Sequence, residues 1–442
     1  FHLFPKRLQA PVMTDMRPKV LIASLGTRGD VQPYVALARE LAARDAEVVV
    51  TTGEGFDDMI EAAGARARPA PINYQELLQT AEVREALFSL KGMIKSARQN
   101  INLQKEVARK LWQIGLDEKP DLILFNLKAT VMTLVARRLN IPALPTSLQP
   151  VTAPTGDFPI ALFGVPNLGS YLNRKSYVLG RWLMKAGLRP LVRSLQDDAI
   201  AEINRPEEQI DGYMPDGSKA LSLQAFSSAL VPTPEDWPPE VLSCGYWFTD
   251  PDPDYRPPEA LETFLQSGPA PTYLGFGSMP SKNPQHLTDT VLTALSKTGN
   301  RAILATGWGG MIREKLPADL ADRVLLLDKA PHSWLFPRCA AIVHHGGAGT
   351  THEAIRWGKP SLVCPVFGDQ PFWGERIHRI GAGPAAIKQK KLTAENLAKA
   401  LKDLENPDYK SGAEKASGII ARELGAKGTA IRLLDQFTTV PA

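Results

Sequence analysis

The chain has 442 residues, of which 44% are hydrophobic and 22% charged, and this length and composition indicate a globular protein of two or three domains. The net charge of +4 is small for this length, and no stripe of arginine and lysine interleaves with aromatic residues, so nothing indicates a nucleic-acid-binding protein. No apolar stretch approaches the ~20 residues that a transmembrane helix needs.

The first half of the chain begins like an α/β domain. An apolar strand is predicted over residues 19–24, and the loop LGTRGDVQ follows it. A helix is predicted over 33–43, with Pro33 in its first turn, and a second strand over 47–52. Strand, loop, helix and strand in this order open a doubly wound domain. Later strands are predicted over 121–126 and 143–147.

The second half repeats this plan after a linker. Residues 250–258, DPDPDYRPP, are rich in Pro and Asp and can form neither a helix nor a central strand. A strand is then predicted over 272–276, a helix over 285–298 and a strand over 301–306. The chain therefore contains two similar α/β halves.

Residues 343–377, VHHGGAGTTHEAIRWGKPSLVCPVFGDQPFWGERI, are the most informative segment. A predicted strand over 340–343 ends at two histidines, and glycines then allow a sharp turn into a helix predicted over 350–357. The free N–H groups at such a helix start form an anion site. Asp369 and Gln370 follow the next strand, and their side chains can bind sugar hydroxyls. An ordinary strand–turn–helix unit is the alternative, but the histidines and the Asp-Gln pair favour a site for a sugar diphosphate.

This segment resembles the donor-binding signature of nucleotide-sugar glycosyltransferases. The plant signature runs His, a glycine-rich turn, Glu, Gly-x-Pro, Pro, and then Asp or Glu before Gln. The corresponding residues, without gaps, are His345, Gly347, Glu353, Gly358, Pro360, Pro365, Asp369 and Gln370. The sequences HHGGAGTT and FGDQPFWG resemble those of the sterol and bacterial natural-product glucosyltransferases more closely.

The resemblance implies a set of donor-binding residues. Those expected at the diphosphate are Gly277, Ser278, His345, Gly347, Ala348, Gly349 and Thr350. Asp369, Gln370 and Trp373 are expected at the sugar, although Trp373 could equally only pack. Lys329 stands where the plant enzymes have a Trp that stacks on uracil, so base recognition is expected from Trp308 or from main-chain groups near Ala330. Glu353 is expected to bond within its helix or to the ribose.

Asp30, in the loop GTRGDVQPY, is the expected catalytic base. The loop follows the first strand at its carboxyl end, where α/β proteins bind ligands, and a carboxylate there can take the proton of an attacking hydroxyl. By pattern alone, Asp30 could equally cap the helix that follows. The resemblance favours the base, because the sterol and antibiotic branches use the Asp where plant enzymes use a His. No His occurs between His2 and His286.

The fold that the resemblance implies is GT-B, with two Rossmann-like domains facing each other across a deep cleft. We predict an acceptor-binding domain over 17–249, the linker 250–258, a nucleotide-sugar-binding domain over 259–424, and a tail, 425–442, that packs back on the first domain. The tail is predicted to be helical over 415–437.

The reaction that the resemblance implies is an inverting transfer of a hexose from a UDP-sugar to a hydroxyl group, with glucose as the leading candidate for the hexose. No cofactor is expected, because the UDP-sugar is a co-substrate, and no carboxylate cluster indicates a metal. The aromatic-rich stretch 158–205 is predicted to form helices that line the cleft, with Phe163 and Trp182 in the acceptor pocket. The acceptor is expected to be a hydrophobic small molecule: a sterol, terpenoid, flavonoid or polyketide.

Two other functions fit a similar architecture. A nucleotide-sugar isomerase needs further acid–base groups around the sugar, and a non-catalytic sugar-nucleotide-binding protein has no need of Asp30. Incubation with UDP-glucose and an acceptor panel separates the three functions.

The three widely spaced cysteines, Cys244, Cys339 and Cys364, favour a reducing compartment over a disulfide framework. We therefore expect a cytoplasmic protein, which does not exclude contact with a membrane surface.

Overall fold

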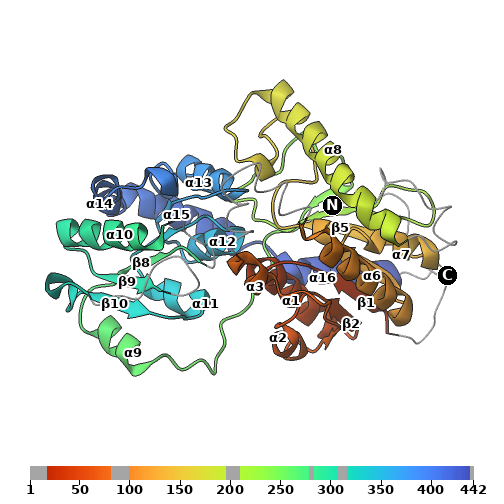
Figure 1. Ribbon diagram of the computed structural model, residues 1–442, viewed down its shortest axis with the longest axis horizontal. Helices are drawn as coiled ribbons and strands as arrows, with labels where there is room; N and C mark the ends of the chain where they lie inside the picture. Colours follow the sequence, from red (N-terminus) through yellow and green to blue (C-terminus); the bar gives the residue numbers. More distant parts are fainter. Residues whose placement is uncertain (1–16, 81–98, 196–209, 278–282, 307–315, 439–442) are drawn as a thin grey trace.

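The computed structural model describes residues 17–80, 99–195, 210–277, 283–306 and 316–438, and Figure 1 shows their arrangement. The predictions for Ser278 and Trp308 lie outside these residues. The chain forms two halves, each built on one parallel sheet.

The first half contains a seven-stranded parallel sheet in the order β3-β2-β1-β4-β5-β6-β7. Its central strands are runs of Val, Ile and Leu because helices cover both faces. The strands are β1 (Lys19–Ala23), β2 (Glu47–Thr51), β3 (Arg66–Ala67), β4 (Leu122–Phe125), β5 (Ala143–Ser147), β6 (Ser222–Gln224) and β7 (Val241–Ser243). The helices are α1 (Arg28–Ala42), α2 (Asp57–Glu61), α3 (Tyr74–Gln79), α6 (Ile101–Glu118), η1 (Leu127–Ala129), α7 (Met132–Leu139), η2 (Ala161–Phe163) and α8 (Ser170–Ser194).

The second half contains a five-stranded parallel sheet in the order β10-β9-β8-β11-β12. Its strands are β8 (Thr272–Gly275), β9 (Ala302–Ala305), β10 (Val324–Leu327), β11 (Ala341–His344) and β12 (Ser361–Val363). The helices before β12 are α9 (Glu259–Gln266), α10 (Pro284–Thr298), η4 (Ala318–Leu320), α11 (His332–Leu335), η5 (Phe336–Arg338) and α12 (Ala348–Arg356). Those after it are α13 (Gln370–Arg379), η6 (Gln389–Lys391), α14 (Ala394–Asp403), α15 (Pro407–Ile420) and α16 (Gly425–Thr438). The prediction of two doubly wound α/β halves is confirmed.

The end of the chain returns to the first half. Helix α16 contacts α1, and its residues Ala430 and Leu433 are buried in the same core as Val35. The Trp247 indole N–H donates to the Thr429 hydroxyl at 3.1 Å. The tail predicted to be helical over 415–437 consists of the end of α15 and of α16, with a short break between them. Gly425 begins the second helix with φ +49°.

The start of α1 also differs from the prediction, which placed Pro33 in the first helical turn. The helix begins at Arg28, five residues before Pro33, so Pro33 lies inside it. A proline there costs one main-chain hydrogen bond because it has no N–H. The cap at Thr27 fixes the helix start instead, and this places Asp30 within the helix rather than in the preceding loop.

Candidate active site

Asp30 lies in the first turn of α1, directly after the carboxyl end of β1. Its Oδ2 accepts the main-chain N–H of Thr27, the N-cap residue, at 2.9 Å, which is one half of a capping box. The carboxylate therefore stabilises the helix start, while 22% of the side chain remains exposed. Gly26 permits this packing, because a Cβ atom built there would lie 2.2 Å from Asp30 Oδ2. The capping and catalytic interpretations of Asp30 are thus compatible.

Lys128 is a residue of this site that the sequence analysis missed. It lies in η1, directly after β4, and its Nζ is 3.1 Å from Asp30 Oδ2. Asn126 fixes this geometry: its Oδ1 accepts the N–H of Lys128 at 3.1 Å, and its Nδ2 donates to the Leu25 carbonyl at 2.9 Å. The only signal in the sequence is the position of Lys128 after a strand that neighbours β1.

The second half presents a helix N-terminus at the carboxyl end of β11. Gly346 makes the turn with φ +94°, and its N–H donates to His344 Nδ1 at 3.0 Å. Helix α12 starts at Ala348, two residues before the predicted start, and Thr351 donates the first helical N–H to the Gly347 carbonyl at 3.0 Å. The N–H groups of the three preceding residues have no partner within the helix, and they form the expected anion site.

His345 lies between two glycines beside this site. A Cβ atom built on Gly277 would lie 2.7 Å from the His345 ring, and one built on Gly347 would lie 2.6 Å from it. Burial lowers the pKa of His345 to about 4, so the imidazole is neutral near pH 7. It can therefore donate an N–H to a phosphate oxygen, although it carries no positive charge near pH 7 in the free protein.

The expected sugar-binding residues separate into one half-buried carboxylate and two supports. Asp369 precedes α13, and its Oδ2 accepts the indole N–H of Trp373 at 2.7 Å. Trp373 is fully buried, so it holds Asp369 rather than bordering the sugar. The side-chain oxygen of Gln370 accepts the N–H of Val366 at 2.7 Å and so shapes the loop before α13. Asp369 is therefore the member of the three whose carboxylate can meet a sugar.

Electrostatic interactions couple the two halves. Burial raises the pKa of Asp369 to about 6, the Trp373 hydrogen bond opposes this rise, and the charges of Asp30 and Lys128 act on the same carboxyl group. A charge of the first half also acts on His332 in the second half. Burial lowers the pKa of His332 to about 4, and the charge on Arg28 lowers it further. Helices α1 and α12 are also in contact, so the start of α1 lies near the helix that follows the glycine-rich turn.

The expected nucleoside-binding residues lie beside β10 and α12. Ala330 is half-buried in the segment between β10 and α11, where its main-chain groups can meet a base. Glu353 Oε1 accepts the Trp357 indole N–H at 2.7 Å, which is the bond within the helix that the sequence analysis allowed. Burial raises the pKa of Glu353. Ribose contact by Glu353 stays a prediction.

A pair of aromatic residues joins α12 to the first half, and neither was predicted from the sequence. The rings of Tyr246 and His352 stack with centroids 4.2 Å apart. His352 Nε2 accepts the N–H of Ser227 at 3.1 Å, and its Nδ1 lies 2.7 Å from the Ala348 carbonyl oxygen. These contacts fix the position of α12 relative to the first half, which carries Asp30 on α1.

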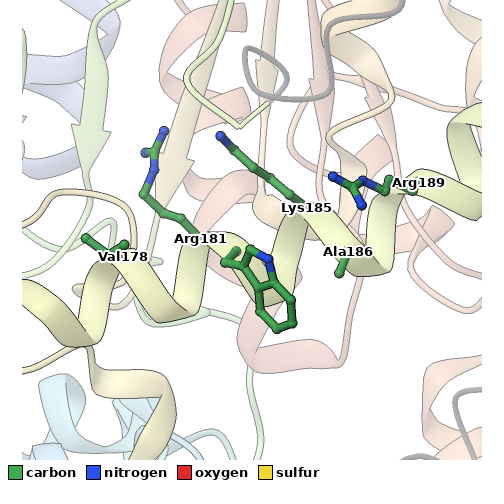
Figure 2. Close-up of a pocket in the computed structure, with 6 residues that line it drawn as sticks. Val178, Arg181, Lys185, Ala186 and Arg189 are labelled. Atoms are coloured by element: carbon green, nitrogen blue, oxygen red, sulfur yellow. The ribbon is translucent and has the colours of Figure 1, made fainter.

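Phe163 and Trp182, the expected acceptor residues, lie on different sides of α8. The Phe163 ring lies near Gly180, on the buried side of α8, whereas Trp182 is 62% exposed and two residues further along the helix. A pocket of about 330 Å³ lies along α8, and Figure 2 shows the residues that line it. Its lining residues in the described chain are Val178, Arg181, Trp182, Lys185, Ala186 and Arg189.

The described ranges contain neither a metal-binding cluster nor a membrane-spanning helix. Nowhere in the described ranges do three or more His, Cys, Asp or Glu side chains gather as they would around a metal ion. Within those ranges, every helix is too short or too polar to cross a membrane.

Two family models match this chain. Residues 20–154 match the glycosyltransferase family 28 N-terminal domain, which covers the segment with Asp30 and Lys128. Residues 308–425 match the C-terminal domain of erythromycin biosynthesis protein CIII-like proteins, which covers the segment with His345 and Asp369. The two halves of the site therefore fall in separate matched domains.

Curated relatives and solved structures agree with these matches. The chain is 34% identical to sterol 3-beta-glucosyltransferase UGT80A2 of Arabidopsis thaliana over 93% of this chain and 64% of that protein. It is 32% identical to UGT80B1 of the same plant, over 96% and 68%. It spans 27% of a sterol 3-beta-glucosyltransferase of Emericella nidulans, at 30% identity over 87% of this chain.

Among solved structures, the glycosyltransferase of kitacinnamycin superposes with a TM-score of 0.70 at 16% identity, over 95% of this chain and all of that one. The calicheamicin glycosyltransferase CalG4 superposes with a TM-score of 0.68 at 19% identity, over 96% and 100%. These likenesses confirm the predicted GT-B fold. The chain belongs to the GT-B glycosyltransferases, in the family that contains the sterol 3-beta-glucosyltransferases.

Proposed function

We propose that this protein transfers a hexose from a UDP-sugar to a hydroxyl group of a hydrophobic small molecule. Glucose is the leading candidate for the hexose. Sterols lead the acceptor classes, because the plant relatives named above are sterol 3-beta-glucosyltransferases. The observation that carries the proposal is the contact between α1, which holds the Asp30–Lys128 pair, and α12, whose start follows the glycine-rich turn. A Cβ atom built on Gly164 of the first half would also lie 3.0 Å from the Gly368 carbonyl oxygen, next to Asp369. These contacts support a shared site for the proposed base and the proposed sugar-binding carboxylate.

The reaction is a single displacement. Asp30 takes the proton of the acceptor hydroxyl, and the oxygen attacks the anomeric carbon. The bond between that carbon and the β-phosphate oxygen breaks, and UDP leaves with its electron pair. A displacement in line inverts the anomeric centre, so an α-linked donor gives a β-glycoside.

The leaving diphosphate is stabilised by groups that the fold has already oriented. The free N–H groups at the start of α12 point out of the helix along its dipole. His345 adds a neutral N–H, and its pKa rises once a dianionic phosphate lies beside it. We propose that these groups suffice without a divalent ion. Full activity in EDTA supports this step, and loss of activity that Mg²⁺ restores contradicts it.

The central test is incubation with UDP-glucose and a panel of sterol, terpenoid, flavonoid and polyketide acceptors. A β-glucoside, identified by the coupling constant of its anomeric proton, is the expected product. A new nucleotide sugar formed without acceptor indicates an isomerase, and tight UDP-glucose binding without turnover indicates a non-catalytic protein. Either result overturns the proposal.

The role of Asp30 needs a variant that preserves its cap. Asp30→Asn keeps an oxygen that can accept the Thr27 N–H, but it has no basic carboxylate. We expect at least a hundredfold loss of kcat with unchanged UDP affinity, within the range for general base catalysis. Asp58→Asn, in the first turn of α2, is the matched control and should behave as wild type. Full turnover by Asp30→Asn removes Asp30 from the mechanism.

A further inference from the structure

Large exposed apolar side chains in the described chain concentrate between residues 162 and 183. On α8, Tyr171 is 70% exposed, Val178 63% and Trp182 62%. Their spacings of seven and four residues place them on one side of the helix. The opposite side is buried, with Tyr177 and Gly180 against the first half. This one helix therefore has a packed side and an unusually apolar outer side.

Basic residues continue the same outer side. Lys175, Lys185 and Arg189 share its helical register, and together with Tyr171, Val178 and Trp182 they form what we call the α8 stripe. The Lys175 ammonium lies 5.4 Å from the centre of the Tyr171 ring. Figure 2 shows Val178, Lys185 and Arg189 in this order along the helix. Figure 1 shows α8 at the upper edge of the molecule.

The charge on α8 is of one sign. Its sequence, SYLNRKSYVLGRWLMKAGLRPLVRS, contains Lys and Arg but neither Asp nor Glu. Arg174 and Arg181, at the flanks of the stripe, form ion pairs with Asp236 and Asp211. Within the described residues, no ion pair involves the lysines or the arginine of the stripe itself. A partner that compensates these charges must be anionic.

We propose that the α8 stripe docks against an anionic lipid surface. Tyr and Trp side chains favour the headgroup level of a bilayer, and apolar neighbours enter the acyl boundary. Lys and Arg at the same level are attracted to anionic headgroups. The stripe runs from Tyr171 to Arg189, about 27 Å along the helix, which is longer than a small acceptor molecule can cover. A flat surface of apolar and anionic character fits this length.

The test is sedimentation of the full chain with vesicles. One set contains phosphatidylcholine alone, and the other contains phosphatidylcholine and phosphatidylglycerol in equal parts. We expect about tenfold to hundredfold stronger binding to the anionic set, since three basic side chains contribute. The binding should weaken as salt rises from about 0.1 M to about 1 M, because the Debye length shortens.

Two double variants separate the charged and apolar contributions. Lys185→Glu with Arg189→Glu should remove the preference for anionic vesicles, and Val178→Ser with Trp182→Ser should lower binding to both sets. Val178, Trp182 and Arg189 are exposed and Lys185 is half-buried, so the thermal unfolding midpoint of each variant is measured beside the binding and should stay close to that of wild type. Leu424→Ser and Lys402→Glu are the controls, because both residues are exposed and lie outside α8.

Three outcomes overturn the inference. The first is equal binding to both vesicle sets, and the second is wild-type binding by the charge-reversed variant. The third is a concentration-dependent dimer that the Val178→Ser and Trp182→Ser variant abolishes, which makes a second copy of the chain the occupant. Docking is a binding measurement, so its failure leaves the glycosyltransferase proposal intact.

Discussion

Lys128→Met tests whether the ion pair beside the proposed base tunes the reaction. Lys128 Nζ and Asp30 Oδ2 are 3.1 Å apart, which corresponds to about 1.3 kcal/mol of Coulomb attraction in water. Solvent screens the pair, because 49% of the Lys128 side chain is exposed, so we use about 0.5–1 kcal/mol. Removal of the Lys128 ammonium should lower kcat/KM about two- to fivefold, because the Asp30 carboxylate loses the attraction that holds it in this position.

The assay is kcat/KM for UDP-glucose at a fixed pH with a saturating acceptor. The Lys128→Met variant should be about two- to fivefold slower than wild type. Lys128→Arg should retain the wild-type kcat/KM because it keeps the positive charge, and Lys402→Met, at an exposed lysine outside the candidate site, is the control. An unchanged kcat/KM for Lys128→Met refutes the electrostatic reasoning, and an equal loss in Lys128→Arg shows that the charge is not what matters.

Three further predictions concern stability and donor binding. Hydrogen bonds from Arg66 and then Lys19 lower the pKa of buried Glu118 from 4.5 to about 2, so the stability they give is present above pH 4.5 and lost toward pH 2. Glu118→Gln should therefore cost about 1–3 kcal/mol at pH 7 by urea denaturation, and a difference that stays constant to pH 2 contradicts this. The raised pKa of Asp369, about 6 against 3.8, means that stability is lost as pH rises through 6. Asp369→Asn should be about 1–3 kcal/mol more stable than wild type at pH 8 but should bind the donor more weakly. A wild-type protein whose free energy of unfolding is the same at pH 4 and pH 8 contradicts this prediction. Gly346→Ala should destabilise by about 1–3 kcal/mol, because φ is +94° and the new Cβ would lie 2.6 Å from Val363 Cγ1, whereas Gly418→Ala in open space should be neutral.

Local pattern was sufficient for most of the fold. Strands such as β2 and β5 are short apolar runs bounded by turn residues, and they lie within one residue of their predicted limits. Helix starts were less predictable. The prediction for α1 relied on Pro33, whereas the Thr27–Asp30 cap decides the start, and both signals occur in the same ten residues. The boundary predicted at 425 coincides with the start of α16 at Gly425.

The candidate site divides in the same way. Asp30, His345 and Asp369 follow strand ends and occur in recognisable motifs, so the sequence identifies them without coordinates. Lys128 belongs to no motif, and it reaches Asp30 only because β4 neighbours β1 in the sheet. Trp373 stands inside a motif, yet its burial makes it a support for Asp369.

The sequence by itself determined the class of fold and the donor half of the site. These depend on contiguous signals: strand periodicity, the glycine-rich turn into α12, and the Asp-Gln pair. Only the tertiary structure decided how Asp30 is held, which charge lies beside it, and that the two halves act on each other's charges. It also decided that α8 buries one side and exposes the other, so that Phe163 and Trp182 lie on different sides of this helix. The physical reason is that burial and charge pairing depend on neighbours distant in the chain, and no local pattern records them.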